Sequence, residues 1–197
     1  MTARDDIFKA IQRAELAPSP LPPAYVPPPV QDLLQRFTAM AERAAVELRV
    51  LSTSTEVPDA IADILRARNL PARLHVPNGS MLDISGWHGE LLETPPGPDA
   101  AALAHVPLAI AETGTLVYPA STSRPASWHF RAGLEIAVLG ARDIVGHMED
   151  ALAKVADMGL PPTLNFVTGP SRTADIEQTL ELGAHGPKAL CLLLIKE

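Results

Sequence analysis

Three short polar turns carry the residue types that could do chemistry in this 197-residue chain. The first turn is Glu112-Thr113-Gly114-Thr115, in which a carboxylate directly follows an apolar run. Partial burial there would raise the pKa of the Glu112 carboxyl, which could then act as an acid, a base or a nucleophile. The alternative is that Glu112 only ends a strand and pairs with an arginine.

The second turn follows an apolar run over residues 163–168. We expect this run to be a strand, ended by Gly169-Pro170 and followed by a helix over residues 174–182. In α/β proteins, ligand sites form at the carboxyl ends of strands, and N–H groups at a helix start favour anions. The alternative is that the polar residues only cap the helix. The candidate ligand contacts in this turn are Gly169, Ser171, Arg172, Thr173 and Asp175.

The third turn holds His185, which has glycine on both sides, at Gly183 and Gly186, just before the last strand. Glycine lets the backbone approach a ligand closely, so His185 is a candidate contact. A structural role, in which His185 bonds the preceding turn, stays open. The expected helix over residues 174–182 would separate His185 from Arg172 by roughly 13 Å at the usual helical rise, so the two need not share a pocket.

Helices that alternate with apolar strands must position these turns. We expect helices over residues 32–47, 56–69 and 143–158, and strands over 46–51, 73–76, 134–139, 163–168 and 189–195. Residues 108–112 and 115–118 form either a tight pair of strands or one bulged strand, and residues 100–103 suggest a helical turn. Continuous apolar strands indicate an α/β fold with a mainly parallel sheet and helices on both faces.

The N-terminal part differs in composition from the rest of the chain. Residues 2–16 have helical spacing of apolar side chains, and a proline-rich segment over 18–29 follows. Such a segment is extended and stiff, because proline lacks a donor and fixes φ. We therefore divide the chain into an N-terminal helix with its spacer, 1–29, and a domain, 30–197. The helix packs either on its own domain or on another chain.

The net charge and the single cysteine exclude several classes of partner and site. A net charge of −7 argues against nucleic acid as a partner. The sequence contains neither an eighteen-residue apolar run nor a signal peptide, which predicts a cytoplasmic protein without a membrane span. Cys191 is the single cysteine, so an internal disulfide, an iron–sulfur cluster or a zinc site built from thiolates is excluded. We expect Cys191 to be a buried strand thiol.

The three turns together resemble a known family. The segments 111–116, 166–177 and 182–187, in this order and spacing, look like the signature of the LUD domain family, and within it the lactate utilization protein C group (YkgG-type). The likeness extends from Ala104 to the end of the chain. Two segments depart from the family pattern and border the expected pocket, namely 104–107 and 128–131.

The resemblance implies a Rossmann-like fold related to the CoA-transferase and sugar-phosphate-isomerase group. It further implies a subunit of a system that oxidises L-lactate to pyruvate, in which partner proteins hold the iron–sulfur clusters and this chain binds no cofactor. The family assigns no catalytic residue, so Glu112 is only a candidate and the chain is not expected to act alone. The alternative is a stand-alone protein or enzyme that binds a small anion, such as a carboxylate or sugar phosphate.

Overall fold

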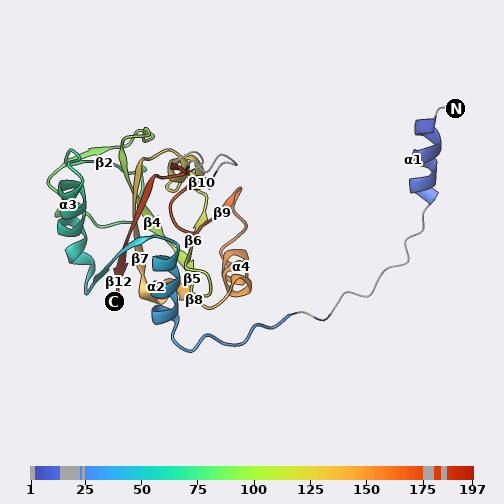
Figure 1. The fold of residues 1–197 in the computed structure, drawn as a ribbon, viewed down its shortest axis with the longest axis horizontal. Helices are drawn as coiled ribbons and strands as arrows, with labels where there is room; N and C mark the ends of the chain where they lie inside the picture. The colour runs from blue at the N-terminus through green and yellow to red at the C-terminus, as the bar shows by residue number, and fades with distance from the viewer. Residues whose placement is uncertain (1–2, 14–22, 24, 175–179, 183–185) are drawn as a thin grey trace.

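In the part of the chain that the structure describes, the fold is an α/β arrangement of a large six-stranded sheet, a small four-stranded sheet and a two-stranded pair, with three helices packed on the two larger sheets (Figure 1). The computed structural model describes residues 3–13, 23, 25–174, 180–182 and 186–197. The helices are α1 (Ala3–Arg13), α2 (Leu33–Arg43), α3 (Val57–Ala67) and α4 (Met148–Asp157), with single 3-10 turns η1 (Ser54–Glu56), η2 (Ala126–Phe130) and η3 (Ala141–Asp143). The strands are β1 (Glu47–Leu51), β2 (Arg73–His75), β3 (Glu90–Leu92), β4 (Ala101–Val106), β5 (Leu108–Ile110), β6 (Thr115–Pro119), β7 (Leu134–Gly140), β8 (Ile144–Val145), β9 (Leu164–Val167), β10 (Arg172–Ala174), β11 (Leu180–Leu182) and β12 (Ala189–Ile195).

The large sheet has six strands in the order β1-β12-β7-β4-β2-β3, and every neighbouring pair is parallel. Its central strands β12 and β7 are almost entirely buried, as continuous apolar runs in a covered parallel sheet must be. The mainly parallel α/β fold predicted from the sequence is therefore confirmed.

Different layers cover the two faces of the large sheet. On one face, α3 places Ile61, Ile64 and Leu65 against strand residues that include Ile136 and Leu193. On the other face, α2 and the small sheet pack together: Phe37 of α2 and Leu116 of β6 share a cluster with Leu139 and Leu192. Burial of these alternating side chains fixes the large sheet between two apolar layers.

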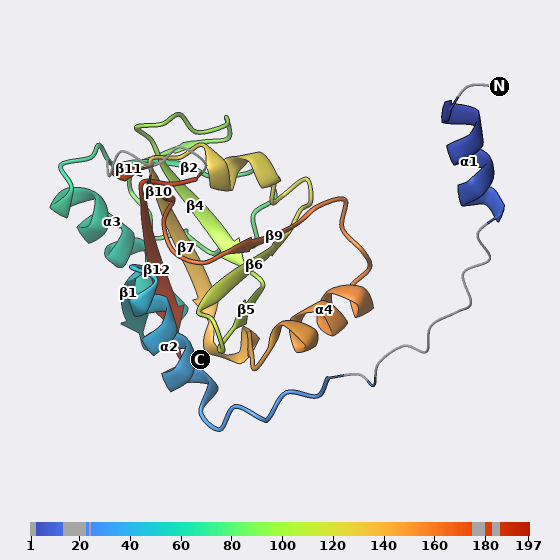
Figure 2. The same ribbon diagram turned by 45° about the vertical axis from the view of Figure 1, so that its right-hand side comes forward.

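The small sheet has the order β8-β5-β6-β9, and α4 covers its outer face (Figure 2). Strands β5 and β6 are antiparallel and joined tightly through residues 111–114, which confirms the two-strand reading of this segment. Strand β9 runs antiparallel to β6, so it does not belong to the parallel sheet.

One expected helical segment is wrong, and another begins five residues later than expected. Residues 100–103 lie at the start of β4, where pairing with β7 in the buried sheet outweighs the helix preference of alanine. The helix expected over 143–158 begins only at Met148, because Ile144 and Val145 pair with β5 as β8. In both segments, buried sheet pairing overrides local propensity.

The helix expected over 174–182 is also wrong at its two described ends, Ala174 and residues 180–182, while residues 175–179 lie outside the described residues. Strands β10 and β11 pair antiparallel there, with Arg172 opposite Leu182 and Ala174 opposite Leu180. The backbone N–H of Ser171 donates to the carbonyl of Pro187 (2.9 Å), two residues before β12, so it bonds to this segment and does not start a helix. A capping signature also fits the start of a strand when β-branched residues such as Thr173 follow it.

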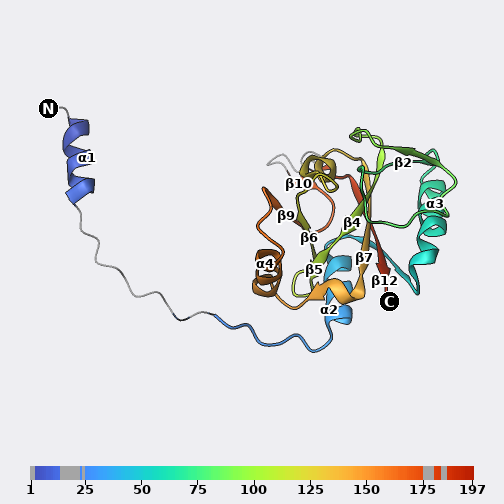
Figure 3. The ribbon, with the colours of Figure 1, turned by 180° about the vertical axis from the view of Figure 1, so that it is seen from behind.

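Helix α1 lies well away from the two sheets (Figure 3). Its apolar residues Ile7, Phe8 and Ile11 are 60%, 53% and 64% exposed. The proline-rich segment meets the domain at Pro28, whose carbonyl lies 2.8 Å from His147 Nε2. Within the described residues, no helix combines the length and apolar character needed to cross a bilayer. The division into 1–29 and 30–197 stays a prediction.

Candidate functional site

The turn over residues 112–115 is built around close approach of a helix. Gly114 has φ +69°, in the left-handed region, and a Cβ there would overlap the backbone of Met40 and Ala41 in α2. Only glycine fits both conditions without strain. Gly114 therefore seats α2 on the β5–β6 hairpin.

Gly169 likewise allows close approach of the backbone at the end of α2. It has φ +77°, and a Cβ at this position would overlap the carbonyl of Ala44, the residue that ends α2. The second family motif thus contacts the same helix as the first. Two glycines of the signature have a packing role, which the ligand-binding interpretation of the sequence did not foresee.

A chain of hydroxyl groups links these two turns. Thr113 Oγ1 and Thr115 Oγ1 lie 2.6 Å apart, and Thr115 Oγ1 and Thr168 Oγ1 lie 2.7 Å apart. Thr115 is 3% exposed, so its hydroxyl needs these partners to offset burial. The threonines hold the start of β6 beside the end of β9.

The third turn contacts the second motif through Ser171. Gly186 lies against Ser171, where a Cβ would come within 3.2 Å of the Ser171 Cβ. Arg172 is exposed, in β10. The predicted site residues Asp175 and His185 lie outside the described residues, as does the side chain of Thr173. The structure thus links the family motifs in one contact network, although the roles of their side chains in ligand binding stay predictions.

The carboxylate of Glu112 bonds a histidine and not an arginine. His147 Nδ1 lies 3.0 Å from Glu112 Oε2, while Arg36 Nη2 donates to the backbone carbonyl of Glu112 (3.3 Å). The Glu112 side chain is 49% exposed, so it is more open than expected and can still reach a ligand.

His147 bridges two acceptors. Its Nδ1 faces the Glu112 carboxylate and its Nε2 faces the carbonyl of Pro28, and neither group can donate a hydrogen. Both contacts are satisfied only when both ring nitrogens carry hydrogens. The bond to Glu112, followed by the bond to Pro28, accordingly raises the pKa of His147 above its usual value. The imidazolium form ties the proline-rich segment to the domain.

A second polar cluster lies deep in the domain. Glu135 of β7 is 1% exposed, and its Oε1 accepts a hydrogen bond from Tyr118 OH (2.8 Å) and lies 3.0 Å from His129 Nδ1. The rings of Tyr118 and His129 stack with centroids 3.9 Å apart. Burial, then the charge of Glu135, raises the pKa of Tyr118 well above its usual value, so the phenol stays a donor. The sequence interpretation missed this cluster, although a glutamate inside the apolar run 134–139 was a usable signal.

A cleft at the carboxyl ends of the large sheet is where the α/β rule places a ligand. It has a volume of about 400 Å³ and a mixed polar lining that includes Ser54, Asp83, His105, Arg142 and Asp143. No family-motif residue that the structure describes lines it. The rule was applied to the turn after residues 163–168, but β9 belongs to the small sheet and not to the parallel one.

Cys191 is a buried thiol, as predicted, with 2% exposure. Burial raises its pKa to about 11, although Arg68 Nη2 lies 3.1 Å from its sulfur. Within the described ranges, no three His, Cys, Asp or Glu side chains gather in a way that could hold a metal ion.

Comparison with known proteins matches residues 100–195 to the LUD domain. The chain is 34% identical over 109 residues to lactate utilization protein C of Geobacillus kaustophilus, covering 50% of this chain and 45% of that protein. It is 35% identical over 95 residues to lactate utilization protein C of Bacillus licheniformis, covering 46% and 40%. Each match thus spans less than half of the relative's length.

The fold also matches a crystal structure of a DUF162 family protein from Deinococcus radiodurans. The TM-score is 0.64 at 22% identity, and the match covers 83% of this chain and 96% of that one. The match to the LUD domain and the relatives named lactate utilization protein C confirm the resemblance found in the three turns, all of which lie within the matched residues 100–195.

Proposed function

We propose that this chain is a subunit of a cytoplasmic L-lactate utilization system, which oxidises lactate to pyruvate together with iron–sulfur partner proteins. The observation that carries the proposal is the LUD domain over residues 100–195, shared with relatives named lactate utilization protein C. The family motifs occur in this segment as one connected network, which supports a fold built as in those relatives.

The chemistry of Cys191 supports a system in which other subunits hold the iron–sulfur clusters. Iron–sulfur clusters need thiolate ligands. The one cysteine of this chain is buried with a raised pKa, and its sulfur contacts Arg68 and Glu47. In the proposed system the clusters lie on the partners, and this chain supplies structure or substrate contacts.

Helix α1 is the proposed docking element for those partners. Its exposed Ile7, Phe8 and Ile11 form an apolar face that an amphipathic helix normally buries. The proline-rich segment that follows would hold this face at a distance from the domain.

Lactate-dependent reduction of an electron-accepting dye tests the proposal. The iron–sulfur partners encoded in the same cell are co-expressed with or without this chain, and dye reduction is measured with L-lactate as the donor. We expect co-purification of the chain and a loss of activity when it is omitted. If the partners reduce the dye equally well without the chain, and the chain elutes alone, the proposed function is wrong.

A further inference from the structure

A small, partly enclosed cavity lies at the edge of β4. Strand β2 pairs with β4 only at His75 and Ala102, so from Leu103 onward this edge of β4 faces other segments. A cavity of about 10 Å³ lies there, at the lower limit of the space needed to hold one water. The polar residues that line it are Ser80, His105, Ser123, Arg124, His129 and Glu135.

His129 lines the inner end of this cavity, which we call the β4-edge pocket, and its ring is held in one orientation by Glu135. Because Glu135 accepts from Nδ1–H, the neutral His129 ring keeps its lone pair on Nε2. His129 is 4% exposed, and its Nε2 is buried with no hydrogen-bond partner among the described residues. Glu135 Oε2 is likewise buried without a partner there. Buried groups of this kind are normally satisfied, so the pocket is built to receive polar atoms.

The outer wall is cationic. Arg124 uses its Nε to donate to the carbonyl of Pro119 (3.3 Å), and no described residue accepts a hydrogen bond from its two Nη groups. Burial and then the charge of Arg124 lower the pKa of His105, against a smaller opposite effect of Asp143. No ion pair joins Arg124 to a carboxylate of the described residues, so its Nη groups are available to an anion from outside the chain.

We propose that the β4-edge pocket binds a small organic carboxylate that carries a second oxygen, a hydroxyl or a carbonyl, next to the carboxylate. The carboxylate pairs with the guanidinium of Arg124, which is suited to bidentate contact. The second oxygen takes the water-sized inner cavity and meets His129 Nε2, which accepts from a hydroxyl in the neutral form and donates to a carbonyl in the protonated form. Glu135 is the positioning residue that sets the ring orientation.

Calorimetric titration of the full chain tests this site. The probes are L-lactate and pyruvate, whose choice rests on the proposed function, with acetate, lactamide and inorganic phosphate as comparisons. We expect lactate or pyruvate to bind, acetate to bind more weakly because it lacks the second oxygen, and lactamide not to bind. If neither lactate nor pyruvate binds, or if phosphate alone binds, the proposal is overturned.

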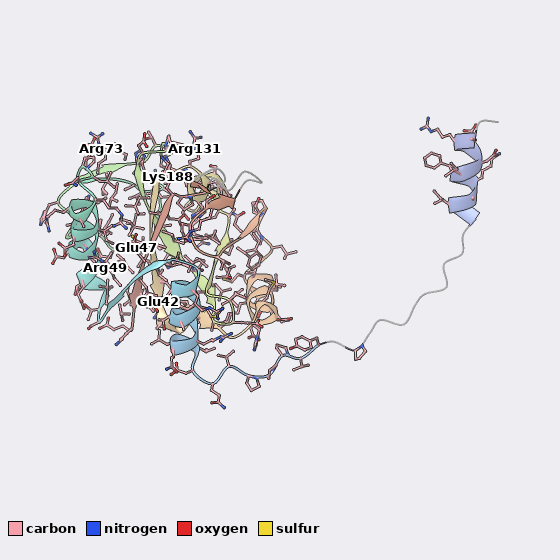
Figure 4. The ribbon with its side chains drawn as sticks, viewed as in Figure 1. Glu42, Glu47, Arg49, Arg73, Arg131 and Lys188 are labelled. Atoms are coloured by element: carbon pink, nitrogen blue, oxygen red, sulfur yellow. The ribbon has the colours of Figure 1, made fainter. Side chains whose placement is uncertain are left out.

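Variants separate this site from other surface cations. Arg124→Gln should weaken carboxylate affinity by about tenfold or more, whereas Arg131→Gln, at an exposed arginine at the end of η2 (Figure 4), should leave it unchanged. Equal affinities in both variants would contradict the assignment of Arg124. His129→Gln should also weaken binding, provided that its melting curve shows a folded protein.

Nitrogen NMR of the wild-type histidines gives a readout that does not depend on a variant folding. The Nδ1 of His129 should carry a hydrogen toward Glu135, and its Nε2 resonance should shift on ligand addition. A ring protonated on Nε2 alone, or an Nε2 resonance that saturating ligand leaves unmoved, would refute the arrangement. Failure of these tests with intact lactate-dependent dye reduction would remove the pocket but leave the proposed function standing.

Discussion

The glycines that seat α2 give a prediction whose size follows from the structure. In Gly114→Ala and Gly169→Ala the new residue must hold a left-handed φ, +69° or +77°, which costs roughly 1–2 kcal/mol. Its methyl group also overlaps the α2 backbone, and relief of such overpacking costs about 1–3 kcal/mol more. We expect each substitution to lower the free energy of unfolding by about 2–5 kcal/mol, a large part of a domain's stability.

Two other glycines supply matched controls. Gly159 has φ +92° but nothing within 4 Å of a built Cβ, so Gly159→Ala should show only the conformational cost, about 1–2 kcal/mol. Gly97 has neither a left-handed φ nor a neighbour within 4 Å, so Gly97→Ala should change stability by less than about 1 kcal/mol. Urea unfolding of the four variants, followed by circular dichroism, measures the series.

The order of the four values decides the role of the motif glycines. The packing role requires Gly114→Ala and Gly169→Ala to be clearly less stable than Gly159→Ala. If all three agree within about 0.5 kcal/mol, the scatter expected of ordinary surface substitutions, the overlap with α2 is relieved without cost. The glycines would then have to be explained by close approach of a ligand, and the packing argument would be refuted.

Three further predictions concern the edges of the domain. His147→Gln should destabilise the protein more at pH 6 than at pH 9. The pKa of His147 is raised in the folded protein, so its stabilisation is complete below the ordinary value near 6.5 and is lost as pH rises through the folded value. A difference in melting temperature that does not change with pH would contradict this. Glu112→Gln should remove most of this pH dependence, and unchanged activity in the dye assay would make Glu112 a structural residue. Deletion of residues 1–24 should keep the melting temperature, because Pro28 and its bond to His147 remain, but should abolish co-purification with the partners; a lower melting temperature would instead show that α1 packs on its own domain.

The sequence was informative wherever burial and local pattern agree. Strands β7 and β12 were predictable because they are continuous apolar runs, as strands of a covered sheet are. Helices α2 and α3 were predictable because their apolar residues recur at helical spacing. The start of β4 at Ala101 and the strand β8 were not, because their pairing partners lie elsewhere in the sequence. Local signals at Ser171 and Thr173 fit a helix cap as well as a strand, and only the pairing of β10 with β11 distinguishes them.

The candidate site residues fall into two groups: motif residues with packing contacts, and buried polar residues without partners. The motifs that revealed the family contain Gly114, Thr115 and Gly169, whose observed contacts join α2 to the small sheet. Among the described residues, three of the five buried side-chain atoms without a hydrogen-bond partner belong instead to His105, His129 and Glu135, which line one cavity, and the other two belong to Trp87 and Asn165. The two histidines lie in the segments that depart from the family pattern. Motif residues that pack elements together indicate the fold. Acid–base chemistry instead needs polar groups that have no hydrogen-bond partner within the protein. Substitutions at the motif glycines should therefore act on stability first, and substitutions at Arg124 and His129 on ligand affinity first.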